Sequence, residues 1–220
     1  MTVSIVVSVL WIAMAVAFPQ NLVDVSQVES RWVIDMKYAT TDNFTKTKLY
    51  PVAKCLVLTP VASQLKRVQA YLDRKHAGMV LMFKDCYRPL SVQKALWQVV
   101  KGTSLQQYVA NPAKGSIHNY GAAVDLTLAD ANGKELDMGT PYDSFTQLAQ
   151  PRYERRFLRS GALTPQEIAN RRMLRRAMKH AGFRGLRNEW WHFDGIPRKV
   201  LKKRYRLLDV PLDGAPAPRR

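Results

Sequence analysis

Two short segments contain the residues whose types and spacing could support catalysis. The first contains His118 and Asp125, seven residues apart, and the second contains Glu189 and His192, three residues apart. Two imidazoles and one carboxylate form the three-ligand set of a catalytic zinc, whose fourth position stays open to water. We interpret His118, Asp125 and His192 as ligands of one Zn²⁺, and Glu189 as the general base for the bound water. This set predicts a zinc hydrolase.

The spacing within each segment limits how these side chains can meet. On a regular strand, residues seven apart point to opposite faces, so His118 and Asp125 share a metal only if the chain bends between them. Gly121 provides the freedom for that bend. Glu189 and His192 also point to opposite faces of a strand, which places Glu189 at the mouth of the strand, near the metal but not bound to it. The neighbouring tryptophans would exclude water and raise the pKa of Glu189.

Each residue taken alone has a simpler interpretation. His118 alone fits a hydrogen-bonded loop histidine, and Asp125 alone fits a buried ion pair with an arginine. Glu189 and His192 alone fit an aromatic core strand with a capped histidine. Together the two segments favour a metal site, because a buried carboxylate is costly unless it is paired or binds a metal.

Charge composition supplies a rival interpretation. The 220 residues include 34 Lys and Arg against 17 Asp and Glu, a formal net charge of +17, with the basic residues concentrated in the last third. Such a charge favours anionic partners. The rival is a protein that binds nucleic acid or another anionic polymer through basic clusters at 171–172, 175–176 and 202–204. A solvated basic helix face is the usual explanation of such clusters, and the signal-like N-terminus described below also argues against nucleic acid. We therefore expect no nucleic-acid partner but an electrostatic association with an anionic envelope surface. No oligomeric state follows from the sequence.

The N-terminus has the features of an export signal. Residues 3–18 form an apolar run interrupted only by Ser4 and Ser8, and no charged side chain precedes Asp24. The run is short for a membrane span, which needs about 20 apolar residues, and it ends in a small-x-small cleavage site at 15–17. We predict a signal peptide at 1–17 and an exported, periplasmic chain. The alternatives are an uncleaved anchor in the inner membrane and a buried N-terminal element.

Cys55 and Cys86 are the two cysteines of the chain. An exported protein would permit one disulfide between them, provided that their Cα atoms lie within about 7 Å. The alternative is a pair of buried thiols that behave as small hydrophobic side chains.

Hydrophobic spacing and turn residues outline one α+β domain over residues 18–210. Thr164 and Glu167 form a capping-box pair, and Ser91 is the expected cap of another helix. His76 and His180 end predicted helices beside basic residues, which explains them without a metal. Strands and helices alternate irregularly, so we predict a mostly antiparallel central sheet flanked by helices, with the zinc site at the sheet. We expect helices at 59–77, 91–100 and 165–181, strands at 79–83, 123–128 and 189–193, and a flexible basic tail at 211–220.

Five segments carry a resemblance to a known family. They are 35–44 (DMKYATTDNF), 87–89 (YRP), 115–128 (GSIHNYGAAVDLTL), 137–143 (DMGTPYD) and 189–193 (EWWHF). From Val33 to Arg206 the chain resembles the zinc D-alanyl-D-alanine dipeptidases of the VanX type, within the larger family of zinc D,D-peptidases. The SxHxxGxAxD and ExxH motifs mark the whole superfamily, whereas the first and fourth segments are more particular to the dipeptidases. The family more often has a small residue at the position of Cys86.

The resemblance implies zinc-dependent hydrolysis of D-Ala-D-Ala to two D-alanines in peptidoglycan metabolism. It implies one Zn²⁺ per chain on the ligands already named, Glu189 as general base, and Arg88 as the group that stabilises the oxyanion. Ser116 would help to hold the polar ends of the substrate, and Tyr38 and Asp137 are candidates for the walls of its pocket. A zinc D,D-carboxypeptidase that acts on longer peptidoglycan stem peptides is the nearest alternative, because it would share the metal site.

The predicted export can be checked on the protein from its native host. We expect mass spectrometry of the envelope fraction to find an N-terminus at Phe18, because the apolar run ends in a cleavage site directly before it. An intact N-terminus in the cytoplasmic fraction would contradict export, and an intact N-terminus in the membrane fraction would support the anchor.

Overall fold

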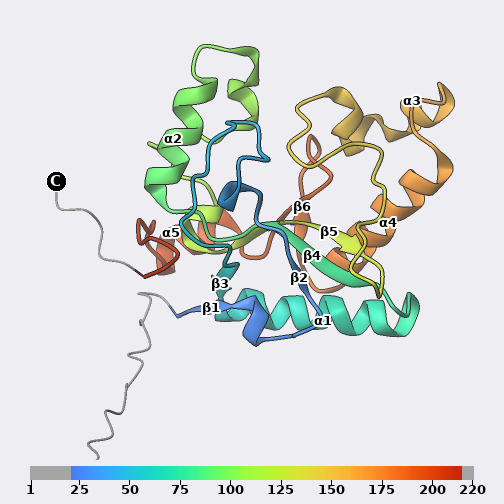
Figure 1. Cartoon of the computed structure of the whole chain (residues 1–220), viewed down its shortest axis with the longest axis horizontal. Helices are drawn as coiled ribbons and strands as arrows, with labels where there is room; N and C mark the ends of the chain where they lie inside the picture. The colour runs from blue at the N-terminus through green and yellow to red at the C-terminus, as the bar shows by residue number, and fades with distance from the viewer. Residues whose placement is uncertain (1–20, 215–220) are drawn as a thin grey trace, which may run out of the picture.

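A five-stranded sheet runs through the structure, a computed structural model that describes residues 21–214 (Figure 1). The β2–β4 pair is parallel and the other three pairs are antiparallel. A separate two-stranded antiparallel sheet pairs β1 with β3. The predicted α+β fold with a mostly antiparallel sheet is therefore confirmed. In spatial order, the strands of the large sheet are β2 (Val33–Ile34), β4 (Val80–Asp85), β5 (Ala123–Ala129), β7 (His192–Asp194) and β6 (Arg184–Gly185), and the small sheet consists of β1 (Leu22–Asp24) and β3 (Leu56–Leu58).

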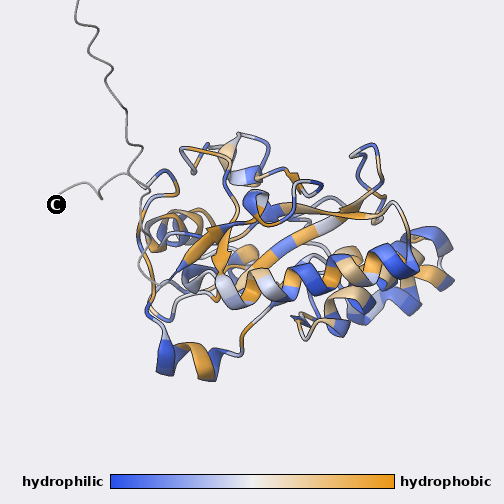
Figure 2. Ribbon diagram, turned by 90° about the horizontal axis from the view of Figure 1, so that it is seen from below, coloured by the Kyte–Doolittle hydropathy of each residue, from blue (hydrophilic) through white to orange (hydrophobic). Residues whose placement is uncertain are grey.

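Two long helices, α1 (Thr59–Lys75) and α4 (Pro165–His180), pack side by side (Figure 1). Hydrophobic residues recur along both at helical spacing and bury one side of each helix against the sheet, while hydrophilic residues remain outside (Figure 2). The β5 residues Leu126 and Leu128 belong to this core. Because side chains alternate along a strand, Asp125 points to the opposite face. The shorter helices are α2 (Leu90–Val100), α3 (Glu154–Arg159) and α5 (Arg198–Arg204).

The sequence located most elements, with differences at their ends. The predicted strand at 79–83 is β4, which continues to Asp85. The predicted capping box is present at α4, where Thr164 Oγ1 accepts from the Glu167 amide. Ser91 does not cap α2, which begins at Leu90, and the Ser91 amide instead donates to Asp209 Oδ1 at 2.7 Å. The predicted strand at 189–193 is shorter, because the chain bends before β7 begins.

One residue of the basic clusters is not at the surface. Arg171 is buried, and its guanidinium donates to the carbonyls of Met138 and Leu148. The neighbouring Arg175 is paired with Glu154 at 2.7 Å, while Arg172 and Arg176 are exposed. The interpretation as a solvated helix face therefore fails for Arg171, whose long side chain holds two loop segments against α4.

The predicted signal peptide and its cleavage site lie outside the described residues. Within residues 21–214, no helix has the length and apolar character that a membrane crossing requires. At the other end, Leu212 is buried although it falls in the predicted tail at 211–220. The packed part of the chain thus extends past Val210, because an apolar side chain there finds room in the core.

The bend before β5 leaves little room for a side chain at Gly121. Its φ is +70°, and a Cβ at this position would lie 2.5 Å from Leu22 Cδ2. Gly102 has a similar φ of +78° but open space around it. We expect Gly121→Ala to lower the free energy of unfolding by about 1–3 kcal/mol more than Gly102→Ala, since only the first overpacks the core. Urea denaturation measures both, and equal losses would contradict the packing argument.

Candidate metal centre and active site

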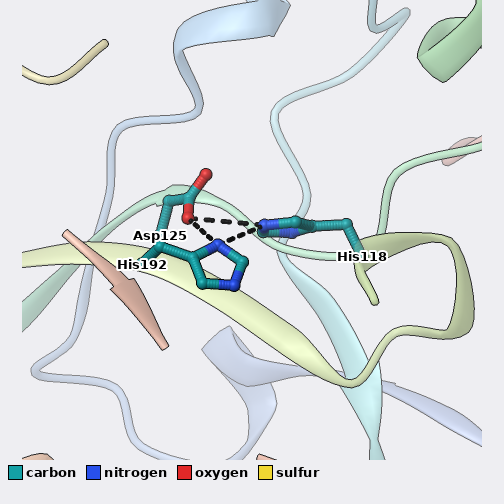
Figure 3. A group of neighbouring side chains, drawn as sticks. All are labelled: His118, Asp125 and His192. Atoms are coloured by element: carbon teal, nitrogen blue, oxygen red, sulfur yellow. Dashed lines mark hydrogen bonds and ion pairs between the residues drawn. The ribbon is translucent and has the colours of Figure 1, made fainter. Parts of the chain in front are cut away.

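The register of the sheet brings two predicted ligands together. Asp125 on β5 lies directly across from His192 on β7. His118 begins a short 3-10 helix, His118–Tyr120, which ends at Gly121 in a left-handed conformation. This turn returns the chain toward β5, as the sequence predicted, so all three side chains point toward one another (Figure 3).

The three ligand atoms form a compact triangle. His192 Nδ1 lies 2.9 Å from Asp125 Oδ1 and 3.1 Å from His118 Nε2, and His118 Nε2 lies 3.4 Å from Asp125 Oδ1. A tetrahedral zinc with bonds of about 2.0–2.1 Å separates its ligand atoms by roughly 3.3 Å. The triangle therefore has the size that one such ion requires. Among the described residues, His118, Asp125 and His192 form the group of His, Cys, Asp or Glu side chains whose ligand atoms lie close enough together to hold one metal ion.

Hydrogen bonds on the outer side of each ring direct a lone pair into the triangle. His118 Nδ1 lies 2.7 Å from the carbonyl oxygen of Cys86, which can only accept, so the proton is on Nδ1 and Nε2 is free to bind. His192 Nε2 lies 2.9 Å from Asp194 Oδ1, which leaves Nδ1 free in the same way. Carboxylate and carbonyl partners of this kind orient histidine ligands in metalloproteins. The donor set fits a metal cation.

The electrostatics of the centre also call for a positive charge. Burial alone would raise the pKa of Asp125, but His118 and His192 hold that pKa well below its ordinary value. Burial lowers the pKa of His192, yet its hydrogen bonds to Asp125 and Asp194 raise it to about 10. A proton or a metal ion must therefore balance the carboxylates, and the two compete for the same lone pairs.

Glu189 lies beside this centre without joining the triangle. Together with His118 and His192 it lines a cavity of about 300 Å³. Burial raises the pKa of Glu189 to about 7, which suits a group that must both accept and release a proton. The adjacent Trp191 is buried at the wall of the same cavity. Glu189 lies three residues before β7 begins.

Arg88 reaches the cavity from the loop that follows β4. Its Nε and one terminal nitrogen donate to Asp85 Oδ2, and the other terminal nitrogen donates to Gln93 Oε1 at 2.9 Å. Asp85 is fully buried and also accepts from the Tyr50 hydroxyl at 2.6 Å. Although burial opposes it, the charge of Asp85 raises the pKa of Arg88 further. The network fixes a permanent positive charge, whose terminal nitrogen lies 3.9 Å from Asp125 Oδ2.

Two of the three predicted substrate-binding residues line the cavity. Ser116 is there, and its hydroxyl accepts from the His118 amide at 3.3 Å. Tyr38 is also there, with the Arg88 guanidinium 5.3 Å from its ring centre. Asp137 does not line this cavity. Its carboxylate accepts from the Gly139 amide and borders a second cavity of about 710 Å³, which shares Phe44 and Asp143 with the first. The assignment of Asp137 to the substrate pocket stays a prediction.

Asp143 and Asp194 complete the site, although neither was given a role of its own from the sequence. Asp143 belongs to the segment 137–143, which carries part of the family resemblance. It lines the cavity beside Glu189 and accepts from the Tyr38 hydroxyl at 2.9 Å. Burial and the nearby charge of Asp125 raise the pKa of Asp143 well above its ordinary value. Asp194 could have been found, since it lies two residues after His192 and therefore on the same face of the strand.

Comparison with known proteins agrees with this geometry. The sequence model described as D-ala-D-ala dipeptidase (Peptidase_M15) matches residues 19–211. The chain belongs to this family. It is accordingly an enzyme, a metallopeptidase, and the resemblance inferred from the sequence is confirmed.

Individual relatives match over most of their length. The D-alanyl-D-alanine dipeptidase of Escherichia coli (strain K12) is 34% identical over 178 residues, which are 79% of this chain and 84% of that protein. The D-alanyl-D-alanine dipeptidase of Enterococcus faecalis (strain ATCC 700802 / V583) is 32% identical over 199 residues, 82% of this chain and 87% of the relative. A crystal structure of vancomycin resistance D,D-dipeptidase VanXYg with a D-Ala-D-Ala phosphinate analog matches at a TM-score of 0.34 and 17% identity, covering 83% of this chain and 70% of that one.

The buried pair of Asp85 and Arg88 generates a stability prediction. Asp85→Ala leaves the Arg88 charge buried without its main partner, which should lower the free energy of unfolding by about 3–5 kcal/mol. Asp42→Ala removes an ion pair with Lys37 at the surface, and should cost at most about 1 kcal/mol. Urea denaturation of both variants tests the difference. A small effect at Asp85 would mean that water or another group takes over the carboxylate's role.

Proposed function

We propose that the enzyme hydrolyses D-Ala-D-Ala to two D-alanines in peptidoglycan metabolism, with one zinc ion held by His118, Asp125 and His192. The observation that carries the proposal is the convergence of three ligand atoms beside a small cavity that also contains Glu189 and Arg88. Membership of the D-ala-D-ala dipeptidase family supports the same substrate.

The residues around the centre can divide the chemistry between them. A zinc ion bound here would act as a Lewis acid toward a carbonyl and lower the pKa of a coordinated water. Glu189 accepts the proton of the attacking water and then delivers it to the leaving amine. Its pKa of about 7 allows both transfers near neutral pH. Trp191 forms part of the wall and limits the access of bulk water.

Arg88 is placed to stabilise negative charge on the scissile carbonyl oxygen. Its bonds to Asp85 and Gln93 hold the guanidinium still before substrate arrives, so little reorganisation is needed as charge develops. A fixed donor of this kind typically contributes about 3–4 kcal/mol to lowering the barrier.

The two ends of a dipeptide need opposite partners, and the cavity offers both. Asp143 and Tyr38 lie on one wall, and an ammonium group there would favour the ionised form of the Asp143 carboxyl. Ser116 and Arg198 also line the cavity and can receive a carboxylate. A volume of about 300 Å³ is at the lower end for ligand pockets, which suits a small substrate.

We further propose that the chain is exported to the periplasm after cleavage of residues 1–17. The apolar N-terminal run supports this location, as does a disulfide between Cys55 and Cys86, since such bonds persist in oxidising compartments. The net charge of +17 would then hold the enzyme near anionic envelope surfaces.

The roles of ligand and base can be separated by two substitutions. Glu189→Gln should retain one zinc per chain and lose turnover by a factor of about 10² to 10⁴, because the amide cannot accept a proton. His192→Ala should lose most of the zinc together with turnover. Elemental analysis and a D-alanine release assay provide the two measurements. Loss of zinc in Glu189→Gln would make Glu189 a ligand, and stoichiometric zinc in His192→Ala would overturn the ligand assignment.

Substrate length distinguishes the dipeptidase from the D,D-carboxypeptidase. We expect turnover of free D-Ala-D-Ala and little turnover of a stem peptide that ends in D-Ala-D-Ala, because the pocket accommodates a free amino end beside Asp143. An L-Ala-L-Ala control tests stereospecificity at the same concentration. Comparable kcat/KM for the dipeptide and the stem peptide would favour the carboxypeptidase instead.

A further inference from the structure

The Cys55–Cys86 disulfide lies directly behind the metal ligand His118. The two cysteines are joined with their Cα atoms 5.2 Å apart, and both are fully buried. The carbonyl oxygen of Cys86 is the atom that accepts the hydrogen bond from His118 Nδ1. One of the two crosslinked residues therefore holds the outer side of this imidazole.

The carbonyl of Cys86 has no support from the ladder of the large sheet. β4 ends at Asp85, and its pairing with β5 shifts register between Phe83 and Asp85. The Cys86 amide turns back to Asp85 Oδ1 at 2.9 Å, and the next amide, that of Tyr87, donates to the carbonyl of Leu56 at 2.9 Å. The segment that carries the carbonyl is thus attached to β3 and, two residues further on, to the His118 turn, because the Arg88 amide donates to the His118 carbonyl at 3.1 Å.

β3 supports His118 from two directions. It begins directly after Cys55, so the disulfide connects it to the carbonyl behind the imidazole ring. At its other end, the Leu58 amide donates to the carbonyl of Gly121 at 2.8 Å, and Gly121 ends the turn that begins with His118. The disulfide is the covalent part of this support, and it links the small sheet to the end of β4.

We propose that Cys55 and Cys86 are positioning residues for the metal, because their disulfide fixes the carbonyl that orients His118 and sets its tautomer. This inference rests on the zinc site proposed above. Removal of an outer partner of a ligand histidine typically lowers metal affinity about 10- to 100-fold. A disulfide that only constrains the unfolded chain would change stability and leave the affinity of the folded protein unaltered. The same chain should therefore bind zinc more tightly when the cysteines are oxidised.

Cys55→Ser tests this role, because it breaks the crosslink and leaves the Cys86 carbonyl in the chain. The zinc Kd is measured by competition with a chromophoric chelator, and the Tm is measured on the zinc-free protein. We expect the Kd to rise about tenfold or more. The control Val68→Ala removes buried volume from α1 and leaves the disulfide and the ligand hydrogen bonds in place, so it should lower the Tm without raising the Kd. An unchanged Kd in Cys55→Ser, or an equal rise in both variants, would overturn the proposal.

A second measurement uses the unmodified chain. Wild-type protein is reduced with a phosphine, freed of reductant under nitrogen, and compared with the oxidised form after thiol counting and circular dichroism confirm both states. A tenfold weaker zinc affinity in the reduced, folded protein would support the positioning role, and equal affinities would overturn it. If the oxidised wild type fails to bind stoichiometric zinc, the proposed metal site fails instead, so the two failures are distinguishable.

Discussion

The register between β5 and β7 is the constraint on which the active site depends. Asp125 and His192 are direct partners across this pair, and both side chains lie on the face of the sheet that α1 and α4 leave uncovered. A slip of one residue would turn Asp125 toward the helices and bring Leu126 to the centre. The leucines of β5, packed in the main core, make such a slip costly. Burial of one face thus determines the chemistry that is available on the other.

The buried charges of the site also determine how its side chains are arranged. Asp85, Arg88 and Asp125 lie close together with little access to water, and each is tolerated only because another charge or donor satisfies it. The guanidinium of Arg88 is held by Asp85, while the charge of Asp125 is stabilised by His118 and His192. The arrangement costs stability but leaves a rigid positive group beside a site for a metal. Catalytic geometry is fixed here by the requirement to balance charges.

The sequence located the chemistry better than the surroundings of the chemistry. His118, Asp125 and Glu189 were identifiable because few residue types bind metal or move protons, and because a glycine between the first two allowed the necessary bend. The sequence could not place the side chain of Asp137, since a polar residue in a motif does not reveal whether its side chain enters a pocket or caps a turn. Arg171 was misread for a similar reason: a basic residue on a helix looks solvated until its burial is known.

Other parts of the site leave no trace in a single sequence. The carbonyl of Cys86 belongs to the backbone, so the residue type at this position could not have predicted its contact with His118. Asp143 enters the cavity through a loop whose path is set by α4 and the neighbouring aromatic residues. The strand that carries His192 is also shorter than its apolar pattern suggested, because the chain bends between Glu189 and His192. Tertiary packing, and not local propensity, determines each of these features.

The position of β7 in the chain has a consequence for biosynthesis. His118 and Asp125 leave the ribosome long before His192, which lies 67 residues after Asp125 in the chain. Until that strand inserts between β5 and β6, the nascent polypeptide presents only two of the three ligands and an unpaired sheet edge. Insertion of the proposed metal would therefore follow the synthesis of β7. A product truncated before β7 would lack one of the proposed ligands and would leave the edge of β5 unpaired and prone to aggregation.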